Sequence, residues 1–354
     1  EDPLNKSERL TLFKNANVVD VKADAAQGNI KSVTFNSYTN NEQHTVTAKN
    51  FIMCFGGIEN ARMLLHFNRK YNNKLGNQND NVGRYFMDHP TMIPAQIFTS
   101  DTSVSSSNKN TGEFNVNTYL KLTAEALKKY QTTNLRMPAF QATNYQLSDG
   151  ISSFHILKQG LKSGEMSEDV MEHVGRFFGD FDMVLEAFYR QTFSEELFEH
   201  ANELGGYELN VMMEQEPNRD NRVFLSDQKD KFGIPKINID WQLSDNDKKR
   251  LWKTLEATGK ELGALSMGRL RMLVERSERI FGDQMGFGNH HMGTTRMAER
   301  EKEGVVDKNL KVFGTNNLYI AGSSVFSTGG HVPPTLTIVA LALKLADYLT
   351  EEFS

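Results

Sequence analysis

Cysteine is almost absent from this sequence, since Cys54 is the only one among 354 residues. A single cysteine excludes an intramolecular disulfide and any metal site built from clustered cysteines. Cys54 lies within the apolar run 51–55, which favours a small buried side chain over a reactive nucleophile. Long apolar runs are missing as well: the run 337–346 is interrupted by Lys344 and is too short to span a bilayer.

A strong excess of charge of either sign is also missing. The chain has 40 Lys and Arg against 45 Asp and Glu, a formal net charge of −5. This balance disfavours a surface for nucleic acid or anionic membranes, and 38% hydrophobic with 24% charged residues is typical of a soluble globular protein. The start of the chain, Glu1-Asp2-Pro3, has no targeting pattern, which leaves the compartment open and slightly favours the cytoplasm.

Short strands and one βα unit are predicted for the first part of the chain. Residues 17–23, 30–36 and 44–48 alternate apolar and polar side chains, which predicts a small antiparallel meander. The run 51–55 predicts a strand covered on both faces. It is followed by Gly56-Gly57 and a helical pattern, so that the helix N-terminus can face an anionic group.

The middle of the chain is predicted to be richer in antiparallel strands. Residues 209–215, 221–226 and 236–241 have strand character and are separated by turn residues. A long helix is predicted from Asp245 to about Leu262, with Ser244 as its N-cap.

Two glycine-rich segments near the C-terminus contain the residues best suited to chemistry. They are Gly288-Asn289-His290-His291-Met292-Gly293-Thr294-Thr295-Arg296-Met297 and residues 321–337, which include Ala321-Gly322-Ser323-Ser324 and His331-Val332-Pro333-Pro334-Thr335. Adjacent histidines on a strand point to opposite faces, so we expect at most one to face a given site and we expect no metal site. Taken alone, the residues favour structural histidines. The alternative is a binding loop, whose small residues let backbone N–H groups approach a ligand.

Together with Gly304-Val305-Val306-Asp307 and residues 311–320 between them, these segments resemble the C-terminal block of the glucose–methanol–choline (GMC) family of FAD-dependent oxidoreductases. The resemblance covers most of the chain and is weak between residues 95 and 205. It implies an α/β fold (α+β overall), with an incomplete Rossmann-like FAD-binding domain at 1–95 and 287–354. Residues 96–286 would form a substrate-binding domain with an antiparallel sheet flanked by helices.

The resemblance also assigns catalytic residues. The family's histidine that is followed three residues later by Gly-Thr corresponds to His290, which would act as the general base for the substrate hydroxyl. The family's second His or Asn falls on Pro333 here. Either His331 replaces it as the second catalytic group or the chain works with one. Met87-Asp88-His89-Pro90 resembles a further family pattern, in which we interpret His89 as structural.

Contacts to FAD are implied for three parts of the chain. They are Val18 and Val19 at the adenine, Gly56 and Gly57 at the glycine turn, and a C-terminal part near the pyrophosphate and isoalloxazine. This last part has Ala321, Gly322 and Ser323 after a core strand, and Pro334 and Thr335 at the start of the last helix. Gln215 and His291 are the candidate substrate-binding residues. Strand-edge solvation is the alternative for Gln215, and a packing role is the alternative for His291.

The implied activity is FAD-dependent oxidation of a CH–OH group of a sugar, polyol or other alcohol, with the hydride passing to flavin N5. A sugar or polyol is favoured because the substrate region is rich in Asn, Gln, Asp and Arg. The small-molecule substrate is one expected partner, and neither a nucleic acid nor a membrane span is expected. Two alternatives stay open: a non-catalytic flavoprotein-like fragment, or a lyase on the same fold.

GMC proteins begin with a Gly-x-Gly-x-x-Gly turn that binds the ADP pyrophosphate, and this sequence has none. We therefore expect the chain to correspond to the C-terminal two-thirds of a family member. It should need an N-terminal FAD-binding segment, which can be a separate chain. This chain alone is expected to be inactive.

Overall fold

The computed structural model describes residues 10–24, 26–40, 42–99, 102–106, 108–110, 112, 115–141, 149–164, 166, 169–181, 184–185 and 206–352. Helices and antiparallel sheets are mixed, as predicted. The chain divides into two compact units: unit 1 is Glu1–His89, Glu214–Asp247 and Phe287–Ser354, and unit 2 is Pro90–Met213 and Lys248–Gly286. The strand-rich residues 214–247, which the sequence places in the substrate-binding domain, belong to unit 1. The functions of the two domains stay predictions.

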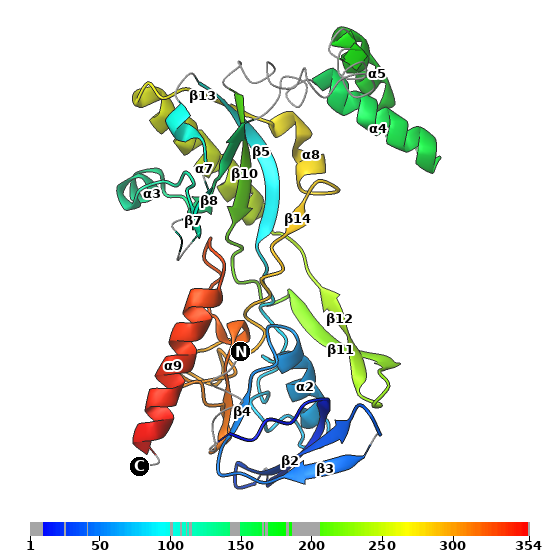
Figure 1. Cartoon of the computed structure of the whole chain (residues 1–354), viewed down its shortest axis with the longest axis vertical. Coiled ribbons are helices and arrows are strands. Elements are labelled where there is room, and N and C mark those ends of the chain that lie inside the picture. Colours follow the sequence, from blue (N-terminus) through cyan, green and yellow to red (C-terminus); the bar gives the residue numbers. More distant parts are fainter. Residues whose placement is uncertain are drawn as a thin grey trace. The chain divides into compact units, whose positions relative to one another are not determined.

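Unit 1 contains the predicted meander and the predicted βα unit (Figure 1). The meander consists of β1 (Ala16–Asp24), β2 (Asn29–Ser37) and β3 (Gln43–Val46), paired antiparallel in that order. β4 (Phe51–Met53) is followed by α2 (Glu59–Asn68) and pairs in parallel with β15 (Leu318–Ile320). The unit also contains the hairpin of β11 (Arg222–Lys229) and β12 (Pro235–Asp240), the short 3₁₀ turn Ser323–Val325, and the last helix α9 (Thr335–Glu352).

The parallel pairing of β4 and β15 brings two distant segments together. Parallel strands end at the same edge of a sheet, so residues 54–57 and 321–323 lie side by side. The Ala321 N–H donates to the Met53 carbonyl at 2.9 Å. The buried Asn60 side chain accepts from the Phe55 N–H at 2.9 Å and donates to the Ala321 carbonyl at 3.3 Å. These contacts fix both strand ends at one place.

Burial in unit 1 is one-sided at two apolar elements. Phe51 and Met53 of β4 are buried, whereas Ile52 between them is 46% exposed. The expectation that both faces of this strand are covered is therefore wrong for the described residues, and Cys54, expected to be buried, is exposed. Apolar residues are exposed on α9 too, with Leu336 at 82%. None of the described helices has both the length and the apolar character that crossing a bilayer requires.

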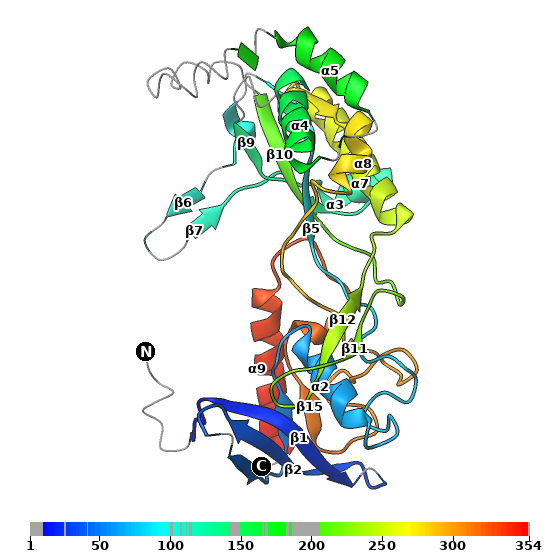
Figure 2. The same cartoon turned by 90° about the vertical axis from the view of Figure 1, so that its right-hand side faces the viewer.

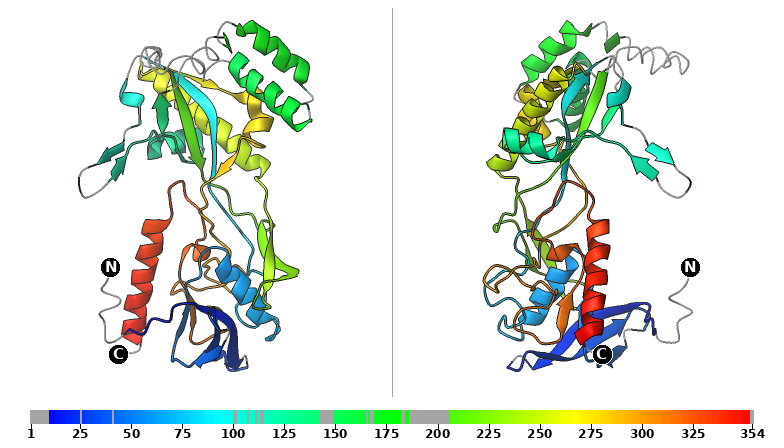
Figure 3. Two further views of the ribbon diagram at one scale, coloured as in Figure 1. Left: turned by 45° about the vertical axis from the view of Figure 1, so that its right-hand side comes forward. Right: turned by 90° about the vertical axis from the view of Figure 1, so that its left-hand side faces the viewer.

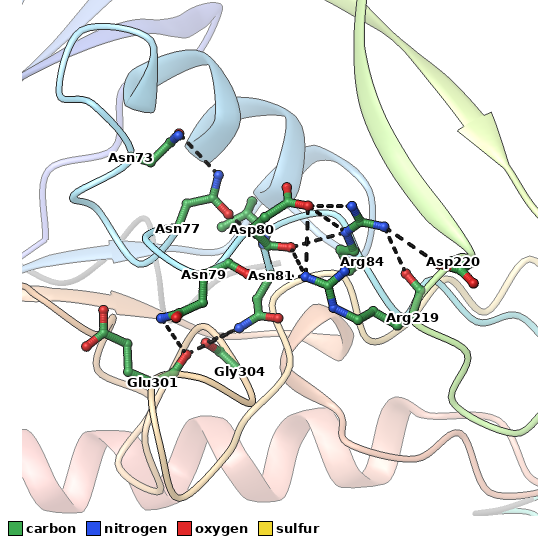
Figure 4. A network of polar contacts seen from close by, with 11 residues as sticks. Asn73, Asn77, Asn79, Asp80, Asn81, Arg84, Arg219, Asp220, Glu301 and Gly304 are labelled. Atoms are coloured by element: carbon green, nitrogen blue, oxygen red, sulfur yellow. Dashed lines mark hydrogen bonds and ion pairs between the residues drawn. The ribbon is translucent and has the colours of Figure 1, made fainter.

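A polar network joins three loops of unit 1 (Figure 4). Asp80 pairs with Arg84, and the Arg219 guanidinium donates to the Asp80 carbonyl at 3.0 Å. Asn81 Nδ2 donates to the Glu301 carbonyl at 3.2 Å. The network therefore holds the chain just before residue 85 against the loop that follows residue 297.

Unit 2 is built around an antiparallel sheet. Its central strands are β5 (Pro90–Phe98) and β10 (Gly206–Met213), cyan and green in Figure 3. β13 (Arg269–Met272) and β14 (Gly286–Phe287) pair with β5, and β8 (Leu135–Arg136) and β9 (Ala139–Gln141) pair with β10. The hairpin of β6 (Asn108–Asn110) and β7 (Asn115–Asn117) is separate from this sheet (Figure 2). The helices are α3 (Ala124–Tyr130), α4 (Asp149–Ser163), α5 (Val170–Gly179), α7 (Asp245–Ala264) and α8 (Ser277–Ile280), and short 3₁₀ turns lie at Thr102–Val104 and Val274–Arg276.

The predicted long helix is α7, and it begins where its cap predicts. The Ser244 hydroxyl accepts from the Asp247 N–H at 3.0 Å, and the Asp247 carboxylate accepts from the Ser244 N–H at 3.3 Å. This reciprocal pair satisfies two of the free donors at the helix N-terminus.

Candidate active site

The two segments that contain His89 and His290 pair side by side in unit 1. Met87 and Met292 exchange backbone hydrogen bonds of 3.0 and 2.9 Å, and the Gly288 N–H donates to the His89 carbonyl at 2.8 Å. The Met87-Asp88-His89-Pro90 motif, interpreted from the sequence as structural, thus lies directly against the predicted catalytic segment.

The rings of His89 and His290 meet through their Nδ1 atoms, which are 2.9 Å apart. The ring centroids are 5.1 Å apart with nearly perpendicular planes. His89 is fully buried, whereas His290 is partly exposed. Burial, followed by the proximity of His290, lowers the pKa of His89 below its ordinary value.

Asp88 connects the backbones of both histidines. Its Oδ1 accepts from the His89 N–H at 2.6 Å and from the His290 N–H at 2.8 Å. Its Oδ2 lies 3.7 Å from Nε2 of His291. One buried carboxylate therefore aligns the two segments and also faces the neighbour of His290.

The second glycine-rich segment contacts His89 through its backbone. His89 Nε2 lies 2.9 Å from the Gly330 carbonyl oxygen and 3.3 Å from that of Gly329. The Gly330 N–H donates to Glu214 Oε1 at 3.0 Å. His331, the candidate second catalytic group, is partly exposed, and Pro333 is exposed. We define the histidine cluster as Asp88, His89, Glu214, His290, His291, Gly329 and Gly330.

The cluster is linked to the shared edge of β4 and β15. Ser323 Oγ donates to the His291 carbonyl at 2.6 Å, and the Thr294 hydroxyl donates to the Gly57 carbonyl. Gly57 packs directly against the backbone of His291, since a Cβ added to Gly57 would lie 2.1 Å from the His291 carbonyl oxygen. Four predicted cofactor-binding residues are thus brought together with His291, namely Gly57, Ala321, Gly322 and Ser323, and Gly56 adjoins them.

The remaining predicted site residues lie elsewhere or are already bonded. Val18 and Val19 lie on β1, where the Val19 carbonyl is 3.1 Å from His66 Nε2. Pro334 is buried and Thr335 exposed at the start of α9. Gln215 is buried, and its Oε1 accepts from the Trp241 indole N–H at 2.9 Å and from the Asp88 N–H at 3.3 Å. Gln215 thus supports the segment that holds the histidines.

Unit 2 contains a separate polar cavity of about 500 Å³ on the β5–β10 sheet. Glu208 and Asn210 alternate along β10 with buried apolar residues and line the cavity. Its other polar lining residues are Thr91, Ser152, Arg276 and Gln284. Burial raises the pKa of the Glu208 carboxyl. We call this the Glu208 cavity.

Metal chemistry has no candidate centre in the part of the chain that the structure describes. There, no group of three or more His, Cys, Asp and Glu side chains is arranged to hold an ion. His89 and His290 instead face each other with their Nδ1 nitrogens.

The chain is similar in sequence to a known family model and to curated dehydrogenases. Residues 217–342 match the family model described as GMC oxidoreductase. The chain is 24% identical to the fructose dehydrogenase large subunit of Gluconobacter japonicus, over 98% of this chain and 55% of that protein. It is 26% identical to 2-methyl-1,2-propanediol dehydrogenase of Mycolicibacterium austroafricanum, over 92% of this chain and 52% of that protein. The chain thus spans about half the length of the curated relatives it matches.

A solved structure supports the same fold. An FAD-dependent oxidoreductase from Chaetomium thermophilum superposes with a TM-score of 0.53 at 18% identity, covering 96% of this chain and 61% of that one. This similarity shows an α/β fold shared with that structure. Residues 217–342 thus match the GMC oxidoreductase family, as the C-terminal motifs predict, and the two relatives extend the similarity over most of the chain.

Five residues of the histidine cluster were not among the predicted site residues: Asp88, His89, Glu214, Gly329 and Gly330. The motif that contains Asp88 and His89 is visible in the sequence. Its pairing with residues 288–292, about 200 positions later, is not a local signal. Glu208 was missed because a single acidic residue in a strand is usually solvated.

Proposed function

We propose that this chain forms part of an FAD-dependent oxidoreductase that oxidises a CH–OH group, with His290 as the general base. The observation that carries the proposal is the histidine cluster. In it, buried His89 contacts the His290 ring and Asp88 holds the His290 backbone, while the adjoining His291 carbonyl accepts from Ser323 at the shared edge of β4 and β15. An imidazole titrates near neutral pH, which suits it to take the hydroxyl proton of an alcohol.

FAD fits the strand edge where the predicted cofactor-binding residues gather. Gly56 has a φ of +93° with nothing within 4 Å of an added Cβ, and Gly322 has a φ of +118° with its nearest neighbour at 3.9 Å. Open space beside glycines at the ends of parallel strands is what the close approach of a dinucleotide requires. Gly56, Gly57, Ala321, Gly322 and Ser323 would hold FAD here, together with Val18, Val19, Pro334 and Thr335. When bound, FAD supplies the acceptor for the hydride.

The chain's own residues would transfer the hydroxyl proton and position the groups around it. His290 accepts the hydroxyl proton at the ring nitrogen that faces away from His89. Asp88 and Glu214 hold the two glycine-rich segments in place through backbone N–H groups. His291 contacts Asp88 and Phe86, which favours a packing role, and His331 remains the candidate second group.

A sugar or polyol is the proposed substrate class, and the Glu208 cavity is a candidate place for binding such a molecule. The Glu208 cavity presents a carboxyl, amides, hydroxyls and a guanidinium, which match the alternating donors and acceptors of a polyhydroxylated molecule. Both curated relatives described above are named for a sugar or diol substrate.

The test is anaerobic flavin reduction in the complete protein that contains this chain. Its purified form should contain FAD, and a panel of sugars, polyols and apolar alcohols should bleach the flavin absorbance fastest for a polyhydroxylated member. Bound flavin that no member reduces would support a non-catalytic protein. A product of C–C or C–O cleavage, formed without an electron acceptor, would indicate a lyase.

A further inference from the structure

The two facing Nδ1 atoms of His89 and His290 define where the protons of this pair reside. We propose that His89 is a positioning residue that holds neutral His290 in the tautomer with its proton on Nδ1, so that Nε2 presents a lone pair to the substrate hydroxyl. The inference rests on the proposed role of His290 as the base. It concerns a second histidine to which that proposal gives no part.

The first step is the protonation of His89 Nε2. This nitrogen lies 2.9 Å from the Gly330 carbonyl oxygen and 3.3 Å from that of Gly329. Carbonyl oxygens accept hydrogen bonds and do not donate them. A buried ring nitrogen between two such oxygens must therefore bear the proton.

The second step follows from the neutral state of His89. A neutral imidazole has one donor and one acceptor nitrogen, so a proton on Nε2 makes Nδ1 of His89 the acceptor. Burial and the nearby His290 both lower the pKa of His89, which keeps this ring neutral. His290 Nδ1, 2.9 Å away, must then be the donor.

The third step gives the state of the base. With its proton on Nδ1, neutral His290 has a lone pair on Nε2, for which the described residues provide no hydrogen-bond partner. Nε2 can then take the substrate hydroxyl proton and leave the Nδ1–H···Nδ1 bond intact. The imidazolium that forms keeps its donor to His89, while a second proton on His89 would set two donors against each other.

The backbone around the pair leaves little freedom for the rings. Asp88 Oδ1 accepts from the backbone N–H groups of both histidines. A Cβ added to Gly288 would lie 2.7 Å from His290 Nδ1 and 3.2 Å from the Cβ of His89. The absence of a side chain at residue 288 is therefore a condition for the 2.9 Å contact.

Two substitutions of His89 separate positioning from general damage. In His89→Asn the side-chain oxygen occupies roughly the place of Nδ1 and can still accept from His290. In His89→Leu the acceptor is lost and an apolar side chain fills the buried space. Imidazole in water prefers the proton on the nitrogen that corresponds to Nε2, so His290 should revert toward that tautomer in the leucine variant.

The measurement is ¹⁵N NMR of histidine side chains in the complete protein, with His290 signals assigned by their loss in His290→Gln. We expect a protonated Nδ1 and an unprotonated Nε2 for His290 in the wild type and in His89→Asn, and a shift toward protonated Nε2 in His89→Leu. With the best substrate, kcat should fall roughly 10- to 10⁴-fold in His89→Leu and recover largely in His89→Asn. Circular dichroism and flavin content show that each variant is folded.

A wild-type His290 with its proton on Nε2 overturns the inference, as does a tautomer that is the same in both His89 variants. Failure of the proposed function gives a different result: the inferred tautomer is observed, yet turnover survives replacement of His290. If His89→Leu does not fold, the tautomer of the wild type and of His89→Asn still decides the matter.

Discussion

The histidine cluster of unit 1 and the Glu208 cavity of unit 2 are both polar, but they satisfy their polar groups differently. In the cluster, His89 and Asp88 are buried and each bonds to other groups of the protein. In the cavity, the described residues give the partly buried Glu208 carboxyl no hydrogen-bonding or ionic partner, and burial raises its pKa.

The contrast distinguishes chemistry from recognition. A group that must take a proton from a fixed direction benefits from rigid partners, because misplacement by about 1 Å lowers the rate strongly. A group that binds a ligand hydroxyl must keep its hydrogen-bonding capacity free until the ligand arrives. On this basis, changes in the cluster should lower kcat, whereas changes in the cavity should raise KM.

The largest effect is expected for His290→Ala. Removal of the proposed general base should lower kcat by about 10²- to 10⁴-fold and leave the FAD content unchanged. Steady-state kinetics of the complete protein with its best sugar or polyol measures this loss. The matched control is His291→Ala, which removes the adjacent ring and should have a far smaller effect on kcat. Equal losses in the two variants would place the chemistry elsewhere.

The next effect is expected for Gly57→Ala. The new methyl group would lie 2.1 Å from the His291 carbonyl oxygen, so the backbone must shift. We expect a loss of about 1–3 kcal/mol in the free energy of unfolding and a decrease in kcat. Urea denaturation measures the loss, with Gly263→Ala in α7 as a control, since nothing lies within 4 Å of a Cβ there. A Gly57→Ala protein as stable as the wild type would contradict the close packing.

A smaller effect is expected for Glu208→Gln in the cavity. The amide keeps the shape of the carboxyl but weakens its bonds to ligand hydroxyls, so KM should rise roughly tenfold with kcat little changed. Because burial raises the carboxyl pKa, ionisation is costly at neutral pH and the amide should not destabilise the fold. Glu125→Gln on the exposed face of α3 should leave KM unaltered. A fall in kcat with KM unchanged would contradict a substrate-binding role for the Glu208 cavity.

The smallest effect concerns pH. Burial lowers the pKa of His89 and of His66, so below their ordinary pKa of 6.5 the unfolded chain binds protons that the folded chain does not. The free energy of unfolding should therefore decrease as pH falls below 6.5, by up to about 1.4 kcal/mol per pH unit for each histidine. Urea denaturation at several pH values measures the slope. His89→Asn should flatten it, whereas replacement of the exposed His44 by Gln should not.

Much of the fold could be predicted because its signals are local. The alternation in β1 and β2, the Gly56-Gly57 turn before α2 and the Ser244 cap of α7 each depend on a few neighbouring residues. Burial was predicted less well. Ile52 and Cys54 lie in an apolar run that reads as a covered strand, but exposure depends on what packs above the strand, which the run itself does not encode.

In the candidate site, too, local motifs could be predicted from the sequence, whereas contacts between distant segments could not. The predictions for His290 and for residues 321–323 came from motifs, and their roles stay predictions that the geometry supports. His89 needed the pairing of two segments about 200 residues apart before its ring could be placed against His290. Gln215 was a candidate for substrate contact, with strand-edge solvation as the alternative. It is buried, and its bonds to Trp241 and to the backbone of Asp88 give it a supporting position.

The order of synthesis gives the histidine pair one more property. His89 and His290 are separated by 201 positions, and unit 1 is assembled from three stretches of chain. On the ribosome, His89 emerges long before His290 has been synthesised, and no nascent chain that ends before residue 290 can contain the pair. The core of unit 1 therefore stays incomplete until its last stretch, Phe287–Ser354, is synthesised, and all of unit 2 is translated before that.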